Sequence, residues 1–211
     1  MKTASRSLSP GQVLCIKGQS IALDGEWGQC LGTIDRHGVA LVWGASGSGK
    51  TSGVMMLAKE LCKHGKVLWL SLEMGFSLSF RNALKRHGMA DCGCRLQLLE
   101  KCSLEELKER LGKKASPEFV VIDSLQYLGI NYREYKALKE QFPGKLFIFI
   151  SHAKGPQPSG RTAESILYDA DIKVFVEGGK ATTRGRFFGP RQYAVIWPEK
   201  AFDYYGPEIS K

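Results

Sequence analysis

The stretch from Gly44 to Thr51 carries the residue types that bind phosphate groups. It reads Gly-Ala-Ser-Gly-Ser-Gly-Lys-Thr and matches the Walker A pattern at every required position. Glycines let backbone N–H groups wrap phosphates without Cβ clashes, and the N-terminus of a following helix adds its dipole and free donors. The pattern predicts a site for a nucleoside triphosphate, with ATP the expected nucleotide, in which Lys50 reaches the β- and γ-phosphates. The predicted nucleotide-binding residues are Gly44, Ala45, Ser46, Gly47, Ser48, Gly49, Lys50, Thr51 and Ser52.

A second feature is an acid at the end of an apolar run, Asp123 after residues 119–122. A triphosphate is bound together with Mg²⁺, and a hard cation needs oxygen ligands. Because ligands of open α/β folds sit at the carboxyl ends of parallel strands, Asp123 is predicted to be the Walker B acid, with the Thr51 hydroxyl as the other metal-binding group. The alternative is that Asp123 starts an ordinary turn.

Glu73 follows another apolar run, residues 67–72, which comes directly after the predicted phosphate-loop helix. Hydrolysis needs a carboxylate that orients and polarises a water near the γ-phosphate. A Glu at this edge of a sheet could do so, and Glu73 is predicted to be the catalytic base. The alternative is a solvent-exposed turn acid.

The elements that must position these residues alternate between apolar strand runs and helical patterns from residue 38 onward. This alternation predicts an α/β fold with a mainly parallel central sheet flanked by helices, closed by antiparallel hairpin strands at the C-terminal end. The predicted strands are 39–43, 67–72, 95–99, 119–123, 146–151, 172–176, 181–187 and 192–197. The predicted helices are 50–64, 77–87, 104–111, 132–141 and 162–168, and residues 152–161 read as a Gly/Pro-rich loop without regular structure.

Residues 1–37 are interpreted as an N-terminal leader with short strand-like pieces at 12–17 and 20–23, and residues 38–211 as the ATPase domain. The leader could pack on the core or on a neighbouring chain. Residues 1–10 contain basic residues without an apolar stretch behind them, so a cytoplasmic location is expected. The apolar runs are too short to span a membrane, and no membrane partner is expected.

The formal net charge of +9 favours a polyanionic partner such as nucleic acid, although it can also serve solubility alone. The chain has six cysteines, and Cys92, Cys94 and Cys102 lie close together in the sequence. Their spacing fits no standard zinc site, so free thiols are the simpler interpretation and binding by this cluster is left open.

Two short stretches resemble a known superfamily. Ser71-Leu72-Glu73-Met74 is similar to the same four residues in DnaB-type replicative helicases, and Val121-Ile122-Asp123-Ser124 is similar to the Walker B strand of RecA-like ATPases. The motifs follow the order of that superfamily through residues 39–197. The chain also resembles compact RecA-like ATPases of phages and mobile elements. The resemblance implies a RecA-like P-loop ATPase domain at 38–211, with Glu73 as its catalytic base.

The resemblance also gives roles to the region after the strand 146–151. RecA-like proteins carry a polar sensor of the γ-phosphate there, often Gln, and this chain has His152, whose imidazole could take that role or merely cap the strand. The loop that follows sits where RecA-like proteins contact DNA. Lys154 and Arg161 are therefore predicted to contact nucleic acid, the alternative being a plain solvated loop.

Arg184-Gly185-Arg186 resembles a basic-x-Arg pair on a hairpin of hexameric helicases, where it reaches the γ-phosphate of the neighbouring subunit. By this resemblance Arg184 and Arg186 complete the catalytic site in trans, and the chain forms a homo-oligomer, with a hexamer as one option. Lys180 is a further candidate. A basic edge strand that discourages aggregation is the alternative.

Together these features predict a Mg²⁺-dependent ATPase that acts on nucleic acid, with single-stranded DNA as the first candidate. Its expected role is that of a DNA motor, a helicase-like protein or an accessory of replication or recombination. The alternative is a regulatory RecA-like ATPase that acts on protein partners without nucleic acid. A small-molecule phosphotransferase is disfavoured, because the sequence shows no Arg-rich lid helix.

Overall fold

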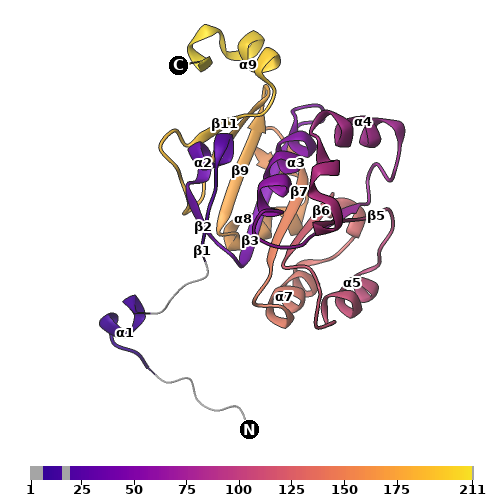
Figure 1. Ribbon diagram of the computed structural model, residues 1–211, viewed down its shortest axis with the longest axis vertical. Helices are drawn as coiled ribbons and strands as arrows, with labels where there is room; N and C mark the ends of the chain where they lie inside the picture. The colour runs from indigo at the N-terminus through magenta and orange to yellow at the C-terminus, as the bar shows by residue number, and fades with distance from the viewer. Residues whose placement is uncertain (1–6, 16–19, 211) are drawn as a thin grey trace.

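The computed structural model describes residues 7–15 and 20–210, and its centre is one twisted sheet with helices on both faces (Figure 1). The strand order is β11-β10-β9-β3-β7-β6-β4-β5, and β8 pairs with β7. The strands from β9 to β5 run parallel, whereas β9, β10 and β11 pair antiparallel. The predicted fold class, a mainly parallel sheet closed by antiparallel strands, is therefore confirmed.

The elements have the following bounds. The strands are β1 (Ser20–Ala22), β2 (Thr33–Asp35), β3 (Gly38–Gly44), β4 (Val67–Ser71), β5 (Leu96–Leu99), β6 (Phe119–Asp123), β7 (Leu146–Lys154), β8 (Gln157–Pro158), β9 (Ile172–Glu177), β10 (Lys180–Thr183) and β11 (Tyr193–Val195). The α-helices are α1 (Pro10–Leu14), α2 (Gly25–Leu31), α3 (Lys50–Leu61), α4 (Leu78–Arg86), α5 (Leu104–Leu111), α6 (Leu125–Leu128), α7 (Tyr132–Gln141), α8 (Arg161–Asp169) and α9 (Pro198–Tyr205). Two 3₁₀ segments are η1 (Met89–Arg95) and η2 (Pro207–Ser210).

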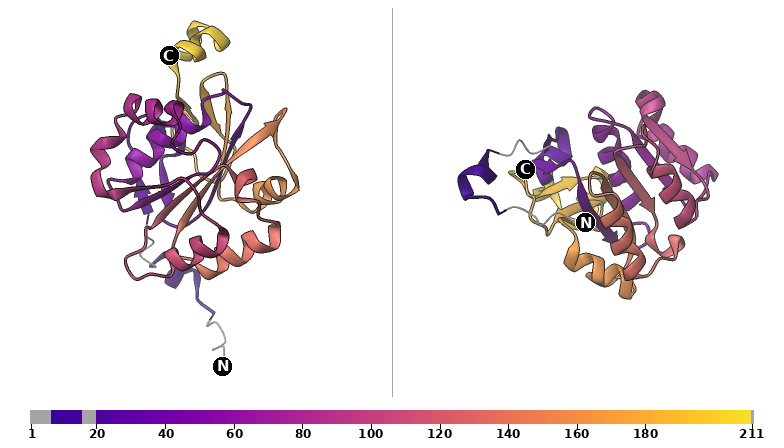
Figure 2. Two further views of the ribbon diagram at one scale, coloured as in Figure 1. Left: turned by 90° about the vertical axis from the view of Figure 1, so that its right-hand side faces the viewer. Right: turned by 90° about the horizontal axis from the view of Figure 1, so that it is seen from below.

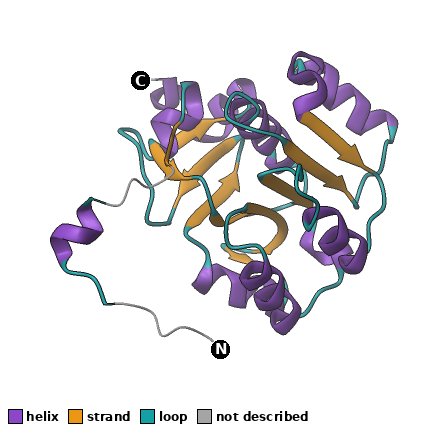
Figure 3. Ribbon diagram, turned by 60° about the horizontal axis from the view of Figure 1, so that its bottom comes forward, coloured by secondary structure: helices purple, strands orange, loops and turns teal. Residues whose placement is uncertain are grey.

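The core has two halves, one on each face of the sheet, because successive side chains of a strand point to opposite faces. In β3, Ala40 and Val42 pack with helices α2, α3 and α4, whereas Leu41 and Trp43 pack with α5, α7 and α8. Figure 2 and Figure 3 show these helices covering the two faces of the sheet. Burial on both faces explains why the central strands are continuous apolar runs.

The described part of the N-terminal segment contributes to this core. β1 and β2 form a two-stranded antiparallel ribbon, and α2 packs against β10 and β11. Trp27 of α2 is buried, and its Nε1 donates a hydrogen bond to the Gly53 carbonyl of α3 at 3.0 Å. Residues 20–35 therefore pack on the body of the domain, one of the two options left open by the sequence. The division at residue 37 stays a prediction.

The strand expected at 12–17 is wrong for the residues that the structure describes. Pro10–Leu14 form the short helix α1, which Figure 1 shows standing away from the sheet; residues 16 and 17 lie outside the described residues. The reason is local. Ser9 and Gln12 form a reciprocal capping box, and Pro10 occupies the first turn, where its missing N–H costs nothing.

Two expectations about the C-terminal third also need correction, and one helix there was missed. The loop 152–161 contains the end of β7 and the strand β8, which pair as a tight antiparallel hairpin. The strand expected at 181–187 ends at Thr183. Helix α9 was not predicted, although Pro198 in its first turn and Gly206 after its end are ordinary start and stop signals.

No helix among residues 7–15 and 20–210 has the length and apolar character needed to cross a membrane.

Candidate nucleotide and metal site

The phosphate loop connects β3 to α3 at the carboxyl edge of the parallel strands, as its sequence predicts. Gly47 and Gly49 have φ angles of +70° and +106°, a backbone region that side chains disfavour. A Cβ on Gly44 would lie 2.1 Å from the Val176 carbonyl oxygen of β9, so only glycine allows this approach. The Ser48 hydroxyl is buried and has no hydrogen-bond partner among the described residues. The loop thus fits a cradle of backbone donors for phosphate.

Lys50 lies along the loop that precedes it. Its Nζ donates hydrogen bonds to the carbonyl oxygens of Gly44 at 2.9 Å and of Ala45 at 2.8 Å. Burial lowers the pKa of Lys50, and the charges of Glu73 and Asp123 oppose that effect. A lysine that is desolvated in this way gains from an anionic partner.

The two predicted metal-binding groups meet. Thr51 Oγ1 donates a hydrogen bond to Asp123 Oδ2 at 3.3 Å, and both come from elements that end or begin at the same edge. Burial raises the pKa of Asp123 to about 7, and the neighbouring charge of Glu73 acts in the same direction. A hydroxyl beside a buried carboxylate is a suitable donor set for a hard divalent cation, whose charge would favour the ionised carboxylate.

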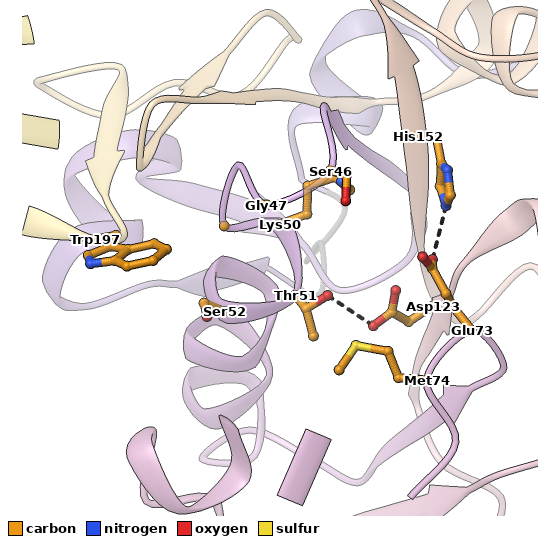
Figure 4. A pocket seen from close by; sticks show the side chains of 11 residues that line it. Ser46, Gly47, Lys50, Thr51, Ser52, Glu73, Met74, Asp123, His152 and Trp197 are labelled. Atoms are coloured by element: carbon orange, nitrogen blue, oxygen red, sulfur yellow. Dashed lines mark hydrogen bonds and ion pairs between the residues drawn. The ribbon is translucent and has the colours of Figure 1, made fainter. Parts of the chain in front are cut away.

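Glu73 lies two residues beyond β4, in a turn anchored to the neighbouring strand. The backbone N–H groups of Leu72 and Glu73 both donate to the Asp123 carbonyl, at 2.7 and 3.0 Å. The Glu73 carboxylate meets His152, whose Nε2 lies 3.0 Å from Oε2 (Figure 4). Sequence reasoning placed both residues at this edge, and the contact between them comes only from the structure.

A pocket of about 260 Å³ joins these groups. It brings together Lys50, Thr51, Glu73, Asp123 and His152 with the tip of the phosphate loop. Its lining residues are Ser46, Gly47, Gly49, Lys50, Thr51, Ser52, Glu73, Met74, Asp123, His152 and Trp197. A charged floor beside an aromatic wall suits a ligand with a phosphate chain and a ring.

Sequence reasoning missed the contribution of helix α9. Trp197, which precedes the helix, lines the pocket and is 47% exposed. Lys200 Nζ donates to the Gly47 carbonyl at 2.8 Å and lies 5.3 Å from the centroid of the Trp197 ring. The start signal at Pro198 could have revealed the helix, but nothing local to this segment shows that it lies beside a loop from the first quarter of the chain.

The two residues predicted to contact nucleic acid lie on the same side of the sheet as the pocket but outside it. Lys154 ends β7 in the β7–β8 hairpin, and Arg161 begins α8 just after the hairpin; both are exposed. The β7–β8 hairpin therefore connects His152, which lines the pocket, to the exposed side chains of Lys154 and Arg161.

The backbone of Arg184 and Arg186 runs beside the start of β9, at the opposite edge of the sheet from the phosphate loop. The side chain of Arg184 reaches back along the sheet, so that its guanidinium carbon lies 4.5 Å from the Phe175 ring centroid and 6.0 Å from that of Trp43. The N–H of Arg186 donates to the Asp171 carbonyl just before β9, and its side chain pairs with the Asp171 carboxylate at 3.2 Å. The register of β9 against β3 puts Ile172 beside Ala40 and Val176 beside Gly44. Four residues of strand, at about 3.3 Å each, thus separate the two edges by roughly 13 Å. The structure does not bring these arginines into the pocket of their own chain.

The three cysteines whose binding was left open differ in their surroundings. Cys92 is buried in the core beside Cys62, Cys94 is exposed and Cys102 is half-buried. Among the described residues there is no group of three or more His, Cys, Asp or Glu side chains that could hold a metal ion.

Comparison with known proteins supports the fold. No protein-family model and no curated protein sequence matches the chain. Among solved structures, the ATPase domain of a DnaB-like helicase is similar, with a TM-score of 0.52 and 17% sequence identity over 74% of this chain and 79% of that one. At this identity the likeness concerns the fold alone. Taken with the strand order and the helices on both faces, it shows that the chain has the fold of a RecA-like ATPase.

Proposed function

We propose that this chain is a Mg²⁺-dependent ATPase of the RecA/DnaB type that acts on nucleic acid, as a DNA motor, helicase-like protein or accessory of replication or recombination. The observation that carries the proposal is the convergence of Lys50, Thr51, Asp123 and Glu73 on one pocket at the carboxyl edge of the sheet. The structural neighbour, described as an ATPase domain, supports the same activity.

Each residue has a distinct role in the proposed reaction. The loop 44–52 binds the phosphates through its backbone N–H groups, and Lys50 turns from the loop carbonyls to the β- and γ-phosphates. Thr51 and Asp123 hold the metal ion, which supplies charge neutralisation for the phosphates when it is bound. Glu73 accepts a proton from the attacking water. His152 senses the γ-phosphate.

Trp197 extends the proposal to the rest of the nucleotide. Its ring forms a wall of the pocket on the side of the phosphate loop. Figure 4 shows it across the loop from His152 and Glu73. A flat aromatic face in this position can stack on a nucleotide base. We therefore place the base of the nucleotide against Trp197, and the γ-phosphate on the opposite side of the pocket, beside Glu73.

The placement of Arg184 and Arg186 supports a site shared between subunits. Neither arginine lines the pocket of its own chain, and Arg186, whose backbone lies at the opposite edge of the sheet, is 76% exposed and available to another chain. A cation supplied in trans stabilises charge that develops in the transition state. The active form in this proposal is a homo-oligomer.

The charge and the hairpin support nucleic acid as the partner. The chain carries a net charge of +9, and Lys154 and Arg161 present exposed cations next to the pocket. Cations of this kind bind a phosphate backbone without reading its sequence. Binding there is close enough to the pocket to influence hydrolysis.

The test is an ATPase assay with and without single-stranded DNA, combined with a mass measurement in solution. The expected result is Mg²⁺-dependent hydrolysis that rises with DNA at low salt and with assembly. Absence of hydrolysis from an assembled chain with DNA and Mg²⁺ present would contradict the proposal.

A second candidate is a regulatory ATPase that acts on a protein partner. It is favoured by the aromatic side chains exposed on α9, Phe202 at 52% and Tyr204 at 58%. Large exposed aromatic residues are enriched at protein interfaces. Hydrolysis that is unaffected by DNA in the assembled protein would support this candidate over the first.

A further inference from the structure

The hydrogen bond between Glu73 and His152 joins the two groups to which separate catalytic roles were assigned. His152 Nε2 lies 3.0 Å from Glu73 Oε2 and 3.4 Å from Ser124 Oγ. Figure 4 shows the two side chains directed at one another across the mouth of the pocket. Their side chains are 41% and 33% exposed, so packing does not enclose them and the bond can open.

While this bond is formed, Glu73 Oε2 and His152 Nε2 are engaged with one another. A general base must offer a carboxylate oxygen to water, and the oxygen that faces the imidazole cannot do so while it accepts this bond. A contact from His152 to the γ-phosphate would use the same Nε2 atom that now faces Glu73. These two atoms are thus free together only when the bond between them is broken.

The backbone of His152 is tied to the end of the β7–β8 hairpin. The Ser159 N–H donates to the His152 carbonyl at 2.8 Å. Gln126 of α6 links the two ends of the hairpin. Its Nε2 donates to Ser151 Oγ at 2.8 Å and to the Ser159 carbonyl at 2.9 Å. A shift of the hairpin is therefore passed to the position of the imidazole.

The other side of the hairpin is anchored less extensively. Trp43 Nε1 donates to the Pro156 carbonyl at 3.0 Å, and two residue pairs, Ala153 with Pro158 and Lys154 with Gln157, join β7 to β8. The tip between these strands is exposed. A short ladder with an exposed tip is an element that a ligand can move, with Lys154 as the cation that the ligand meets.

We propose that His152 is a latch that restrains Glu73, and that a nucleic-acid backbone bound at the β7–β8 hairpin releases it. This inference rests on the proposed function and adds its regulation. The latch has two arrangements, His152 bonded to Glu73 or turned away from it, and the ligand at the hairpin favours the second. In the released arrangement Glu73 can act on water and His152 can meet the γ-phosphate.

The test compares His152→Ala with wild type in steady-state ATPase assays, with and without a single-stranded DNA oligonucleotide. Loss of one hydrogen bond to a charged group should raise kcat without DNA about tenfold, with KM changed less than about twofold. The ratio of kcat with DNA to kcat without DNA should fall toward one. His37→Ala, at an exposed position before β3, is the matched control and should behave as wild type.

Two further variants cover the case in which His152→Ala does not fold. The amide of glutamine can occupy the place of Nε2, so His152→Gln should keep the latch and the stimulation by DNA. Asparagine reaches only as far as Nδ1, so His152→Asn should raise kcat without DNA as the alanine variant does. Equal behaviour of the two amide variants would overturn the proposal.

Other outcomes separate this inference from the proposed function. A lower kcat of His152→Ala both with and without DNA would show that His152 assists Glu73, and would overturn the proposed latch. An unchanged ratio with DNA would overturn the link to the hairpin. In both cases wild type hydrolyses ATP and Glu73→Gln does not, so the proposed function stands. Absence of hydrolysis in wild type would overturn both.

Discussion

The two edges of the central sheet carry different chemistry. At the carboxyl edge, Lys50, Thr51, Asp123 and Glu73 surround one pocket. At the amino edge, Arg186 pairs with Asp171 just before β9, and neither Arg186 nor Arg184 lines that pocket. One chain therefore brings Lys50, Thr51, Asp123 and Glu73 together, whereas Arg184 and Arg186 lie outside that pocket. The difference teaches that residues predicted from the sequence to act at one site can lie apart in a single folded chain.

The largest expected effect is at the carboxyl edge. Glu73→Gln keeps the size of the side chain and removes its basicity, so kcat should fall by about 10⁴-fold, the upper end of what a general base contributes. Binding of a fluorescent ATP analogue should be retained, since Lys50 and the loop are untouched. Glu140→Gln, exposed on α7, is the control. Near-normal turnover of Glu73→Gln would remove Glu73 from its role.

The next effect tests the amino edge. Changing Arg184 and Arg186 together to Ala should lower kcat of the assembled protein by about 10³-fold, the lower end for a cation supplied in trans. Melting temperature should change little, because the exposed pair of Arg186 with Asp171 contributes at most about 1 kcal/mol. Arg133→Ala, exposed on α7, is the control.

Mixing a variant of each edge tests whether the carboxyl edge of one subunit and the arginines of another form one catalytic site. A chain with Glu73→Gln keeps its arginines, and a chain with the double Arg→Ala change keeps Glu73. If subunits share sites, mixed assemblies should regain turnover that neither variant has alone. A mixture that remains inactive, although a mass measurement shows that the chains assemble together, would count against a shared site.

A smaller effect is expected at the hairpin beside the carboxyl edge. Changing Lys154 and Arg161 to Ala removes two cations that face solvent. The affinity for single-stranded DNA should fall about tenfold at 0.1 M salt, and the slope of log K against log salt should become shallower by about 1.4. Fluorescence anisotropy of labelled DNA across a salt series measures both. An unchanged slope would show that nucleic acid does not bind there.

The smallest effect concerns how the Phe175 ring holds the side chain of Arg184. The guanidinium carbon of Arg184 lies 4.5 Å from the centroid of the Phe175 ring. Phe175→Leu keeps an apolar side chain but removes the π face, whose contact with a cation is worth about 0.5–1 kcal/mol. If the contact orients Arg184 for a neighbour, kcat of the assembled protein should fall about threefold. Equal turnover of the variant and wild type would make the contact irrelevant to catalysis.

The central elements could be predicted from the sequence because each carries its own signal. The bounds of α5, β6 and α7 agree with the predicted ranges. A capping box begins α5, an unbroken apolar run forms β6, and Pro143 prevents α7 from continuing. The β7–β8 hairpin lacked such a signal. Its pairing has only two residue pairs and depends on contacts such as that from Trp43 to Pro156, which lie far apart in sequence.

The sequence by itself determined the prediction of which side chains bind phosphate and metal. The spacing of Gly44, Gly49, Lys50 and Thr51 encodes a local turn and helix start, and that geometry depends on neighbours in the chain. Only the tertiary structure decided the contact of His152 with Glu73, the place of Trp197 beside the loop, and the distance of Arg184 and Arg186 from their own pocket. These relations depend on strand order and register, which are set by packing across the whole sheet and are not written into any one segment.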